Sequence, residues 1–241
     1  MLEAINLSKT YDGHDALASL NLRVAPGEIY CLLGANGAGK TTTINLFMGF
    51  ISPSSGQAQV NELDVTEHAS ETKNYLAYIP ENLNLYSNLT GIENLKFFTG
   101  LGGIKLDNAN AELLLQEVGL QQEAMGKSVS KYSKGMRQKV GIAIAKAKNA
   151  ENLLLDEPTS GLDPQASNDF AALLEDLRKN EVAILMATHD LFRAKETGTH
   201  IGIMKAGKLV HSLKSDEVTL TALEELYLET MRSENHAEVT S

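Results

Sequence analysis

Short apolar runs alternate along the chain with segments whose apolar residues have helical spacing. The runs at 28–33, 152–156 and 182–188 are short and apolar enough to be strands buried on both faces of a parallel sheet. Helical spacing appears in the segment 42–50 and in a later segment that contains Phe170, Leu173, Leu174 and Leu177. Strands and helices that alternate in this way predict an α/β fold around a parallel sheet.

The first part of the chain has a different pattern from the middle. Residues 2–24 contain alternating apolar and polar positions, as at Leu20 and Leu22, which predicts an antiparallel sheet. Residues from about 90 to 149 are mostly helical in pattern. They open on Thr90-Gly91-Ile92-Glu93, which fits a capping box at a helix start. We therefore expect a helical subdomain between two sheet-forming regions.

The C-terminal part is expected to form a hairpin and one last helix. Residues 201–204 are expected to pair with residues 208–211 across a turn at Ala206-Gly207, which predicts the hairpin. The last helix is expected from about Asp216 to Arg232, and the polar tail 233–241 is expected to be disordered. The length of the chain favours one domain over residues 1–232.

One loop carries a phosphate-binding motif. Gly34-Ala35-Asn36-Gly37-Ala38-Gly39-Lys40-Thr41 fits the pattern G-x-x-x-x-G-K-[ST], in which backbone N–H groups point at the phosphates of a nucleotide. Lys40 is expected to reach the terminal phosphates, and the Thr41 hydroxyl is expected to bind Mg²⁺. The motif stands between a predicted strand and a predicted helix, which is the context that it requires.

A second feature lies about a hundred residues further on. Tyr132-Ser133-Lys134-Gly135-Met136-Arg137-Gln138 opens a helix with apolar spacing, and Ser133 fits its N-cap, so that the helix start can bind an anion. Because Ser133 is 93 positions after Lys40, it need not bind the same nucleotide as the first loop. The two features together predict an ATPase that closes its site with a second copy of itself.

Several polar residues follow the predicted strands. An aspartate at the carboxyl end of a buried strand, as Asp156 is, can hold Mg²⁺, and the next residue, Glu157, can act as a general base on water. His189 follows the last buried strand, at the edge where strand ends gather around the phosphate loop. Asp163 fits the N-cap of a helix that has Pro164 at its first position.

In their order, these motifs resemble those of the nucleotide-binding subunit of ABC transporters, over about residues 2–210. The resemblance implies a P-loop NTPase core with a parallel sheet, an N-terminal antiparallel β-subdomain and a helical signature subdomain. It implies that ATP is bound by the phosphate loop and the residue after it, which are Gly34, Ala35, Asn36, Gly37, Ala38, Gly39, Lys40, Thr41 and Thr42.

The resemblance implies further nucleotide contacts outside this loop. Tyr11 matches the aromatic residue that stacks on adenine, and Glu81 falls at the Q-loop position. Ser133 and Gly135 match the signature motif, and Asp163 matches the D-loop. Ser133 and Gly135 are expected to contact the ATP held by a second copy, and Asp163 is expected to be a nucleotide-binding residue.

The remaining implied roles are catalysis and metal binding. The residues expected to act in catalysis are Lys40, Glu157 and His189. The residues expected to bind Mg²⁺ are Thr41, Glu81 and Asp156.

Two positions depart from the usual family pattern. Lys134 stands where the signature most often has glycine, and Glu81 stands where the Q-loop usually has glutamine. With the run from Leu223 to Leu228, these variants resemble the type 2 ABC exporter subgroup. This likeness implies that two copies close around two MgATP and drive export through a separate membrane permease.

Composition limits the other functions that the chain could have. Its net charge of −10 and pI near 5.1 argue against nucleic acid as a partner, because binding to nucleic acid depends on neutralising phosphates. No apolar run reaches the roughly 18 to 20 residues of a membrane helix, and the first residues lack a signal-peptide pattern. Cys31 is expected to be a small core residue. We therefore expect a cytoplasmic protein, held at the inner face of the membrane by its permease.

Two alternatives belong to other classes. A soluble P-loop phosphotransferase would share the phosphate loop but would not need Ser133 or His189. A soluble ABC ATPase of chromosome maintenance would need a long coiled coil between Lys40 and Ser133, and one of translation would need two such domains in one chain. The intact Lys40, Asp156, Glu157 and His189 argue against an inactive scaffold.

Overall fold

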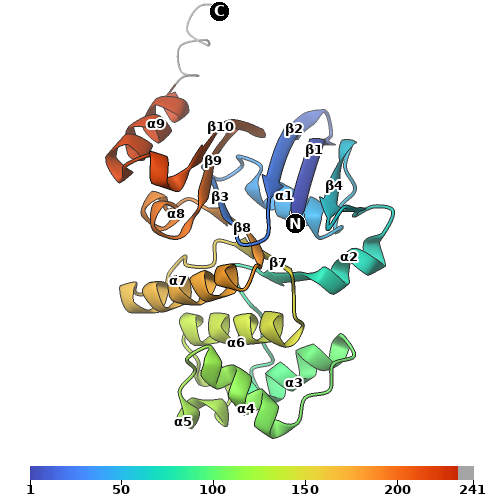
Figure 1. Cartoon of the computed structure of the whole chain (residues 1–241), viewed down its shortest axis with the longest axis vertical. Coiled ribbons are helices and arrows are strands. Elements are labelled where there is room, and N and C mark those ends of the chain that lie inside the picture. The colour runs from blue at the N-terminus through green and yellow to red at the C-terminus, as the bar shows by residue number, and fades with distance from the viewer. Residues whose placement is uncertain (233–241) are drawn as a thin grey trace, which may run out of the picture.

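The computed structural model describes residues 1–232, whose strands form two sheets (Figure 1). The antiparallel sheet has the strand order β2 (His14–Val24), β1 (Leu2–Tyr11), β4 (Ser55–Val60) and β5 (Leu63–Asp64). The second sheet has the order β10 (Lys208–Lys214), β9 (His200–Lys205), β3 (Ile29–Leu33), β8 (Ala183–Thr188), β7 (Asn152–Asp156) and β6 (Leu76–Ile79). Strands β9, β3, β8, β7 and β6 are parallel, and β10 pairs antiparallel with β9. The predicted α/β class and the predicted hairpin are therefore confirmed.

The three central strands of the parallel sheet are buried along their whole length. In β3, Ile29 and Leu33 face the hydrophobic cluster that extends into the helical end of the molecule. Tyr30 and Leu32 face a second cluster, which is shared with the antiparallel sheet. Because both faces of the strand meet a core, an unbroken apolar run is needed there. Cys31 is a free, buried thiol whose pKa burial raises to about 12, so it is the core residue that was expected.

Helices flank both sheets and form one end of the molecule. They are α1 (Lys40–Phe47), α2 (Ala69–Tyr75), α3 (Gly91–Leu101), α4 (Asn108–Glu117), α5 (Gln122–Met125), α6 (Lys134–Ala147), α7 (Pro164–Lys179), α8 (Leu191–Thr197) and α9 (Leu220–Arg232). Helices α3 to α6 form the lower end in Figure 1, as the pattern over 90–149 predicts. The capping box is present, since Thr90 Oγ1 accepts from the Glu93 N–H and Glu93 Oε2 accepts from the Thr90 N–H.

The last helix begins later than the sequence pattern predicts. Residues Ser215–Glu217 form a 3₁₀ turn, and Val218 is extended, with φ −131° and ψ 139°. Thr219 then caps the helix, because its Oγ1 accepts from the Ala222 N–H at 3.2 Å. The expected start at Asp216 is therefore wrong by one turn. The tail 233–241 lies outside the described residues, and none of the helices within 1–232 has the length and apolar content to cross a bilayer.

Candidate active site

The phosphate loop connects β3 to α1 and needs glycine at its close contacts. Gly39 has a φ of +105°, and a Cβ at this position would lie 2.8 Å from the Ala16 carbonyl oxygen. No side chain caps α1 within the described residues, since its N-cap is Gly39 itself. The first N–H groups of α1 therefore remain available to an anion, as the motif requires.

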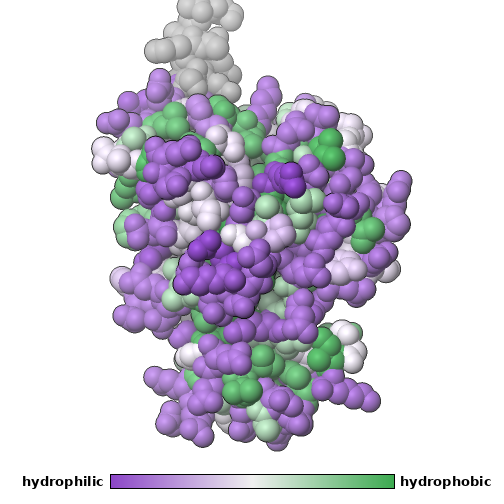
Figure 2. All heavy atoms as spheres, viewed as in Figure 1, coloured by the Kyte–Doolittle hydropathy of each residue, from purple (hydrophilic) through white to green (hydrophobic). Residues whose placement is uncertain are grey.

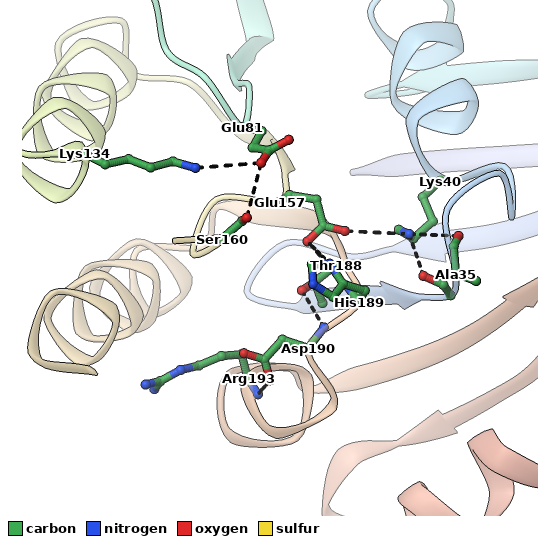
Figure 3. A network of polar contacts seen from close by, with 11 residues as sticks. Ala35, Lys40, Glu81, Lys134, Glu157, Ser160, Thr188, His189, Asp190 and Arg193 are labelled. Carbon is green, nitrogen blue, oxygen red and sulfur yellow. Dashed lines mark hydrogen bonds and ion pairs between the residues drawn. The ribbon is translucent and has the colours of Figure 1, made fainter. Parts of the chain in front are cut away.

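Lys40 is held inside this loop. Its side chain is only 6% exposed, and its Nζ donates to the carbonyl oxygens of Gly34 (2.6 Å) and Ala35 (3.3 Å). It also lies 3.7 Å from Glu157 Oε1 (Figure 3). Phosphate oxygens can replace these carbonyl oxygens as partners of the Lys40 ammonium. A hydrogen bond from an ammonium to a charged phosphate oxygen is stronger than one to a neutral carbonyl oxygen.

Asp156 ends the buried strand β7 beside this lysine. Burial raises the pKa of its carboxyl group above the usual value, a hydrogen bond from Thr41 opposes that rise, and the nearby carboxylate of Glu157 adds to it. Lys40 lowers the pKa slightly, and Glu81 raises it further. The site therefore has more negative charge than its own lysine balances, and this fits a divalent cation.

Glu157 is held in a strained conformation that aims its carboxylate into the site. Its φ is +47°, which is uncommon for a residue with a Cβ, and its N–H donates to the Ala187 carbonyl oxygen on β8 at 2.9 Å. Its Oε2 lies 2.9 Å from His189 Nδ1. Its Oε1 is buried without a hydrogen bond in the described residues, although Lys40 is near. One carboxylate oxygen is thus positioned by His189, and the other is left to accept a proton.

His189 follows β8 at the same edge of the sheet, and its side chain is 60% exposed. The next residue, Asp190, caps α8, because its Oδ1 accepts from the Arg193 N–H at 3.0 Å. The buried Thr188 hydroxyl accepts from the Asp190 N–H at 3.1 Å. These bonds fix the turn that carries His189 (Figure 3). The carboxyl ends of β3, β7 and β8 thus bring Lys40, Glu157 and His189 together.

The signature residues start a different element. Ser133 is exposed, and its Oγ accepts from the Met136 N–H at the start of α6. Gly135 is buried against α7, where a Cβ would lie 3.1 Å from that of Ala166. Asp163 caps α7 by accepting from the Ala166 N–H at 2.8 Å, so the expected cap is present. In residues 1–232 no hydrogen bond or ion pair joins Ser133 or Asp163 to the phosphate loop.

Glu81 lies in the loop after β6, between the catalytic edge and the signature helix. Its side chain is 47% exposed. The Ser160 hydroxyl donates to its Oε1 at 3.2 Å, and Lys134 Nζ lies 3.9 Å from the same oxygen (Figure 3). Sequence reasoning noted both Glu81 and Lys134 but missed their pairing. Their opposite charges, at the only two departures noted from the family pattern, were the available signal.

Tyr11 ends β1 and is 44% exposed. The turn after it contains Asp12 and Gly13, both with positive φ, and places Tyr11 opposite His14. Lys9 Nζ lies over the tyrosine ring at 5.0 Å from its centroid. A partly exposed ring at this turn fits the expected stacking role.

The residues at the sheet edge can bind a magnesium ion only if phosphate oxygens supply further ligands. Within the described part of the chain, no three His, Cys, Asp or Glu side chains form a cluster that could hold a metal. The donors that meet are the Thr41 hydroxyl and the Asp156 carboxylate, with Glu81 nearby. Mg²⁺ is commonly held by one or two carboxylates together with substrate phosphates, so this donor set fits Mg²⁺ bound with ATP.

Comparisons with known proteins agree with this geometry. The family model for "ABC transporter" matches residues 17–160. The "Bacitracin transport ATP-binding protein BcrA" of Bacillus licheniformis is 37% identical over 219 residues, which cover 90% of this chain and 71% of that protein. 

Solved structures of similar proteins share the fold. A structure of an ATP-binding subunit of an ABC transporter has a TM-score of 0.83 and 30% identity, and the match covers 96% of this chain and all of that one. A dimeric ATP-binding cassette in a post-hydrolysis state with ADP and Pi has a TM-score of 0.79 over 89% of this chain and 99% of its own. At 24% identity, this second likeness supports the fold only.

Proposed function

The chain belongs to the ABC transporter family as an ATP-hydrolysing subunit, and we propose that two copies bind two MgATP between them to drive export through a separate membrane permease. The observation that carries this proposal is the separation of two phosphate-binding features. Lys40 is buried inside the phosphate loop, whereas Ser133 is exposed at the start of α6. A second copy turned head to tail would supply its own Ser133 and Gly135 to the nucleotide held at Lys40.

The chain's own groups have distinct tasks in hydrolysis. Lys40 would exchange its carbonyl partners for the terminal phosphates, and Thr41 and Asp156 would hold Mg²⁺, which supplies positive charge at the phosphate oxygens when bound. Glu157 Oε1, which has no hydrogen bond in the described residues, would take a proton from the attacking water. His189 would keep the Glu157 carboxylate oriented through Oε2.

A cavity on the helical side offers a place for the permease. It has a volume of about 410 Å³ and lies next to the loop of Glu81; its lining includes Leu83, Leu85, Phe98, Leu101 and Ile144. Tyr86 and Phe97 are exposed nearby, with ring centroids 4.7 Å apart. Figure 2 shows hydrophobic surface over this helical end of the molecule. An apolar segment of a permease would bury these side chains and hold the subunit at the cytoplasmic face of the membrane.

The two alternative functions fit the structure less well. A P-loop phosphotransferase has no use for an exposed serine at a helix start that makes no hydrogen bond to its own phosphate loop in residues 1–232. A chromosome-maintenance ATPase would need a coiled coil between α1 and α6. The longest helix described between them, α3, has 11 residues.

Substitutions at Glu157 and Lys40 test the proposal. We expect Glu157→Gln to bind MgATP, to hydrolyse it at least ~100-fold more slowly, the upper part of the range for general bases, and to accumulate as an ATP-bound dimer. Lys40→Ala removes the phosphate partner, so we expect no dimer. Gel filtration with and without MgATP measures the dimer, and phosphate release measures turnover. A monomeric Glu157→Gln protein with normal turnover would refute the assignment.

A further inference from the structure

Two charged residues meet between the signature helix and the catalytic edge of the sheet. Lys134 is the first residue of α6, and Glu81 lies in the loop between β6 and α3. Lys134 Nζ is 3.9 Å from Glu81 Oε1, to which the Ser160 hydroxyl donates from a third segment at 3.2 Å. Figure 3 shows the Glu81 carboxylate between Lys134 on one side and Glu157 on the other.

Glu81 is therefore under opposing electrostatic influences. On the side of the sheet edge it faces the carboxylates of Asp156 and Glu157, and it lies close enough to Asp156 to raise the pKa of that group. On the other side it faces the ammonium of Lys134. Without a divalent cation, repulsion by the two carboxylates and attraction by Lys134 both favour the observed position. A divalent cation at Asp156 would reverse the field on the first side.

The loop of Glu81 also packs against the helix that carries Lys134. A Cβ at Gly141 would lie 2.9 Å from Leu83 Cδ2, so the glycine allows Leu83 to lie close to α6. Lys134 and Gly141 are seven residues apart, which is about two helical turns on one face. The helix thus holds the loop at two points, one polar at Glu81 and one apolar at Leu83.

We propose that Lys134 is a positioning residue that holds Glu81 away from the metal site until a divalent cation binds there with ATP. The inference rests on the proposed MgATP site and on the expected role of Glu81 as a third metal ligand beside Thr41 and Asp156. Glu81 then exchanges Lys134 for the cation, and the signature helix loses its ion pair with the loop. Because Leu83 and Leu85 of the same loop line the proposed permease cavity, this exchange connects metal binding to the surface that the permease would occupy.

Binding of Mn²⁺ in the presence of ATP tests the proposal. The parent protein is the full chain with Glu157→Gln, which prevents turnover, and the signal of free Mn²⁺ in electron paramagnetic resonance measures binding. We expect Lys134→Ala to lower the half-saturating Mn²⁺ concentration about two- to fivefold, the range of an exposed ion pair. Lys134→Arg keeps the charge and should stay close to the parent. With Glu81→Gln already present, Lys134→Ala should change nothing further.

Lys131→Ala is the matched control for a general effect of charge. This exposed lysine lies in the turn Val129–Lys131 just before α6, so its removal takes the same charge from the same surface. The proposal is overturned if Lys134→Ala leaves Mn²⁺ binding unchanged, if its effect persists with Glu81→Gln, or if Lys131→Ala gives an equal shift. Gel filtration of the same samples reports the dimer, so a failure of the two-copy site is visible separately from a failure of the Lys134 role.

Discussion

The phosphate loop and the signature helix differ in how firmly one copy of the chain fixes them. Lys40 is buried and bonded to two carbonyl oxygens of its own loop, and Asp156 ends a strand whose every residue is buried. Ser133 is exposed, and the lysine beside it reaches only a half-exposed carboxylate at 3.9 Å. The phosphate-loop half of the site, with Lys40 and Asp156, is held in place by the parallel sheet. The signature half, with Ser133 and Lys134, lies at the surface.

This difference shows what a second copy has to supply. The phosphate loop and the residues proposed to bind Mg²⁺ and to act as general base, Thr41, Asp156 and Glu157, lie along one sheet edge, so we expect one copy to bind nucleotide by itself. The signature groups would add contacts only when another copy brings them. Substitutions in the phosphate-loop half should therefore change the free energy of unfolding. Substitutions in the signature half should instead change the association of two copies.

The largest effect on folding is expected from Gly39→Ala in the phosphate loop. Its φ of +105° is strained for alanine, and the new methyl would lie 2.8 Å from the Ala16 carbonyl oxygen and 3.2 Å from Met204 Cε. Backbone strain and a forced shift together cost about 2–5 kcal/mol in the free energy of unfolding. Denaturant unfolding measures this loss, and ATP binding should be lost with it.

Gly37→Ala is the control for that prediction. Gly37 also has a positive φ, +82°, but a Cβ there would have no neighbour within 4 Å. Only the conformational cost remains, which is about 1 kcal/mol. Equal losses in the two variants would show that contacts of Gly39 do not fix the loop.

A smaller effect, on binding alone, is expected from Tyr11→Ala. The ring is 44% exposed at the end of β1, so its removal leaves no hole in the core. Stacking of an aromatic ring on a base contributes about 1–3 kcal/mol, so ATP affinity should fall roughly 5- to 150-fold with unfolding unchanged. Calorimetric titration measures the affinity. Since stacking selects poorly among bases, GTP should compete, and an unchanged affinity would make Tyr11 a packing residue.

Much of the phosphate-loop half was predictable because local patterns determine it. A strand between two cores must be apolar throughout, and residues 29–33 show this directly. The loop motif fixes the order of glycines, lysine and threonine. In the helical region, Thr90 with Glu93 likewise fixes a helix start through bonds three residues apart. Such signals lie within a few neighbouring residues.

Features that depend on contacts between distant segments were less predictable, in the signature half and elsewhere. Glu81 and Lys134 are 53 positions apart, and no periodicity relates them. The positive φ of Glu157 depends on its bond to Ala187 on the next strand, which a sequence pattern does not reveal. The start of α9 was also missed, since Thr219 competes with Asp216 as a cap.

Only a small effect on folding is expected from Gly135→Ala in the signature helix. Gly135 is helical, and alanine in a helix is favoured over glycine by about 1 kcal/mol. Against this gain, the new methyl would lie 3.1 Å from the Cβ of Ala166, so α6 and α7 must separate by a few tenths of an ångström. The two effects oppose each other, and the free energy of unfolding should change by less than about 1 kcal/mol.

The same variant should weaken association, because the forced separation of α6 from α7 displaces the helix start that a second copy would contact. With Glu157→Gln present, MgATP should produce less dimer from Gly135→Ala than from the parent in gel filtration. Gly100→Ala is the matched control, since Gly100 lies inside α3 and a Cβ there has no neighbour within 4 Å. Gly100→Ala should raise the free energy of unfolding by up to about 1 kcal/mol and leave the dimer intact. A loss of several kcal/mol in Gly135→Ala would instead show that the signature half is fixed as firmly as the phosphate loop, and the contrast between the halves would fail.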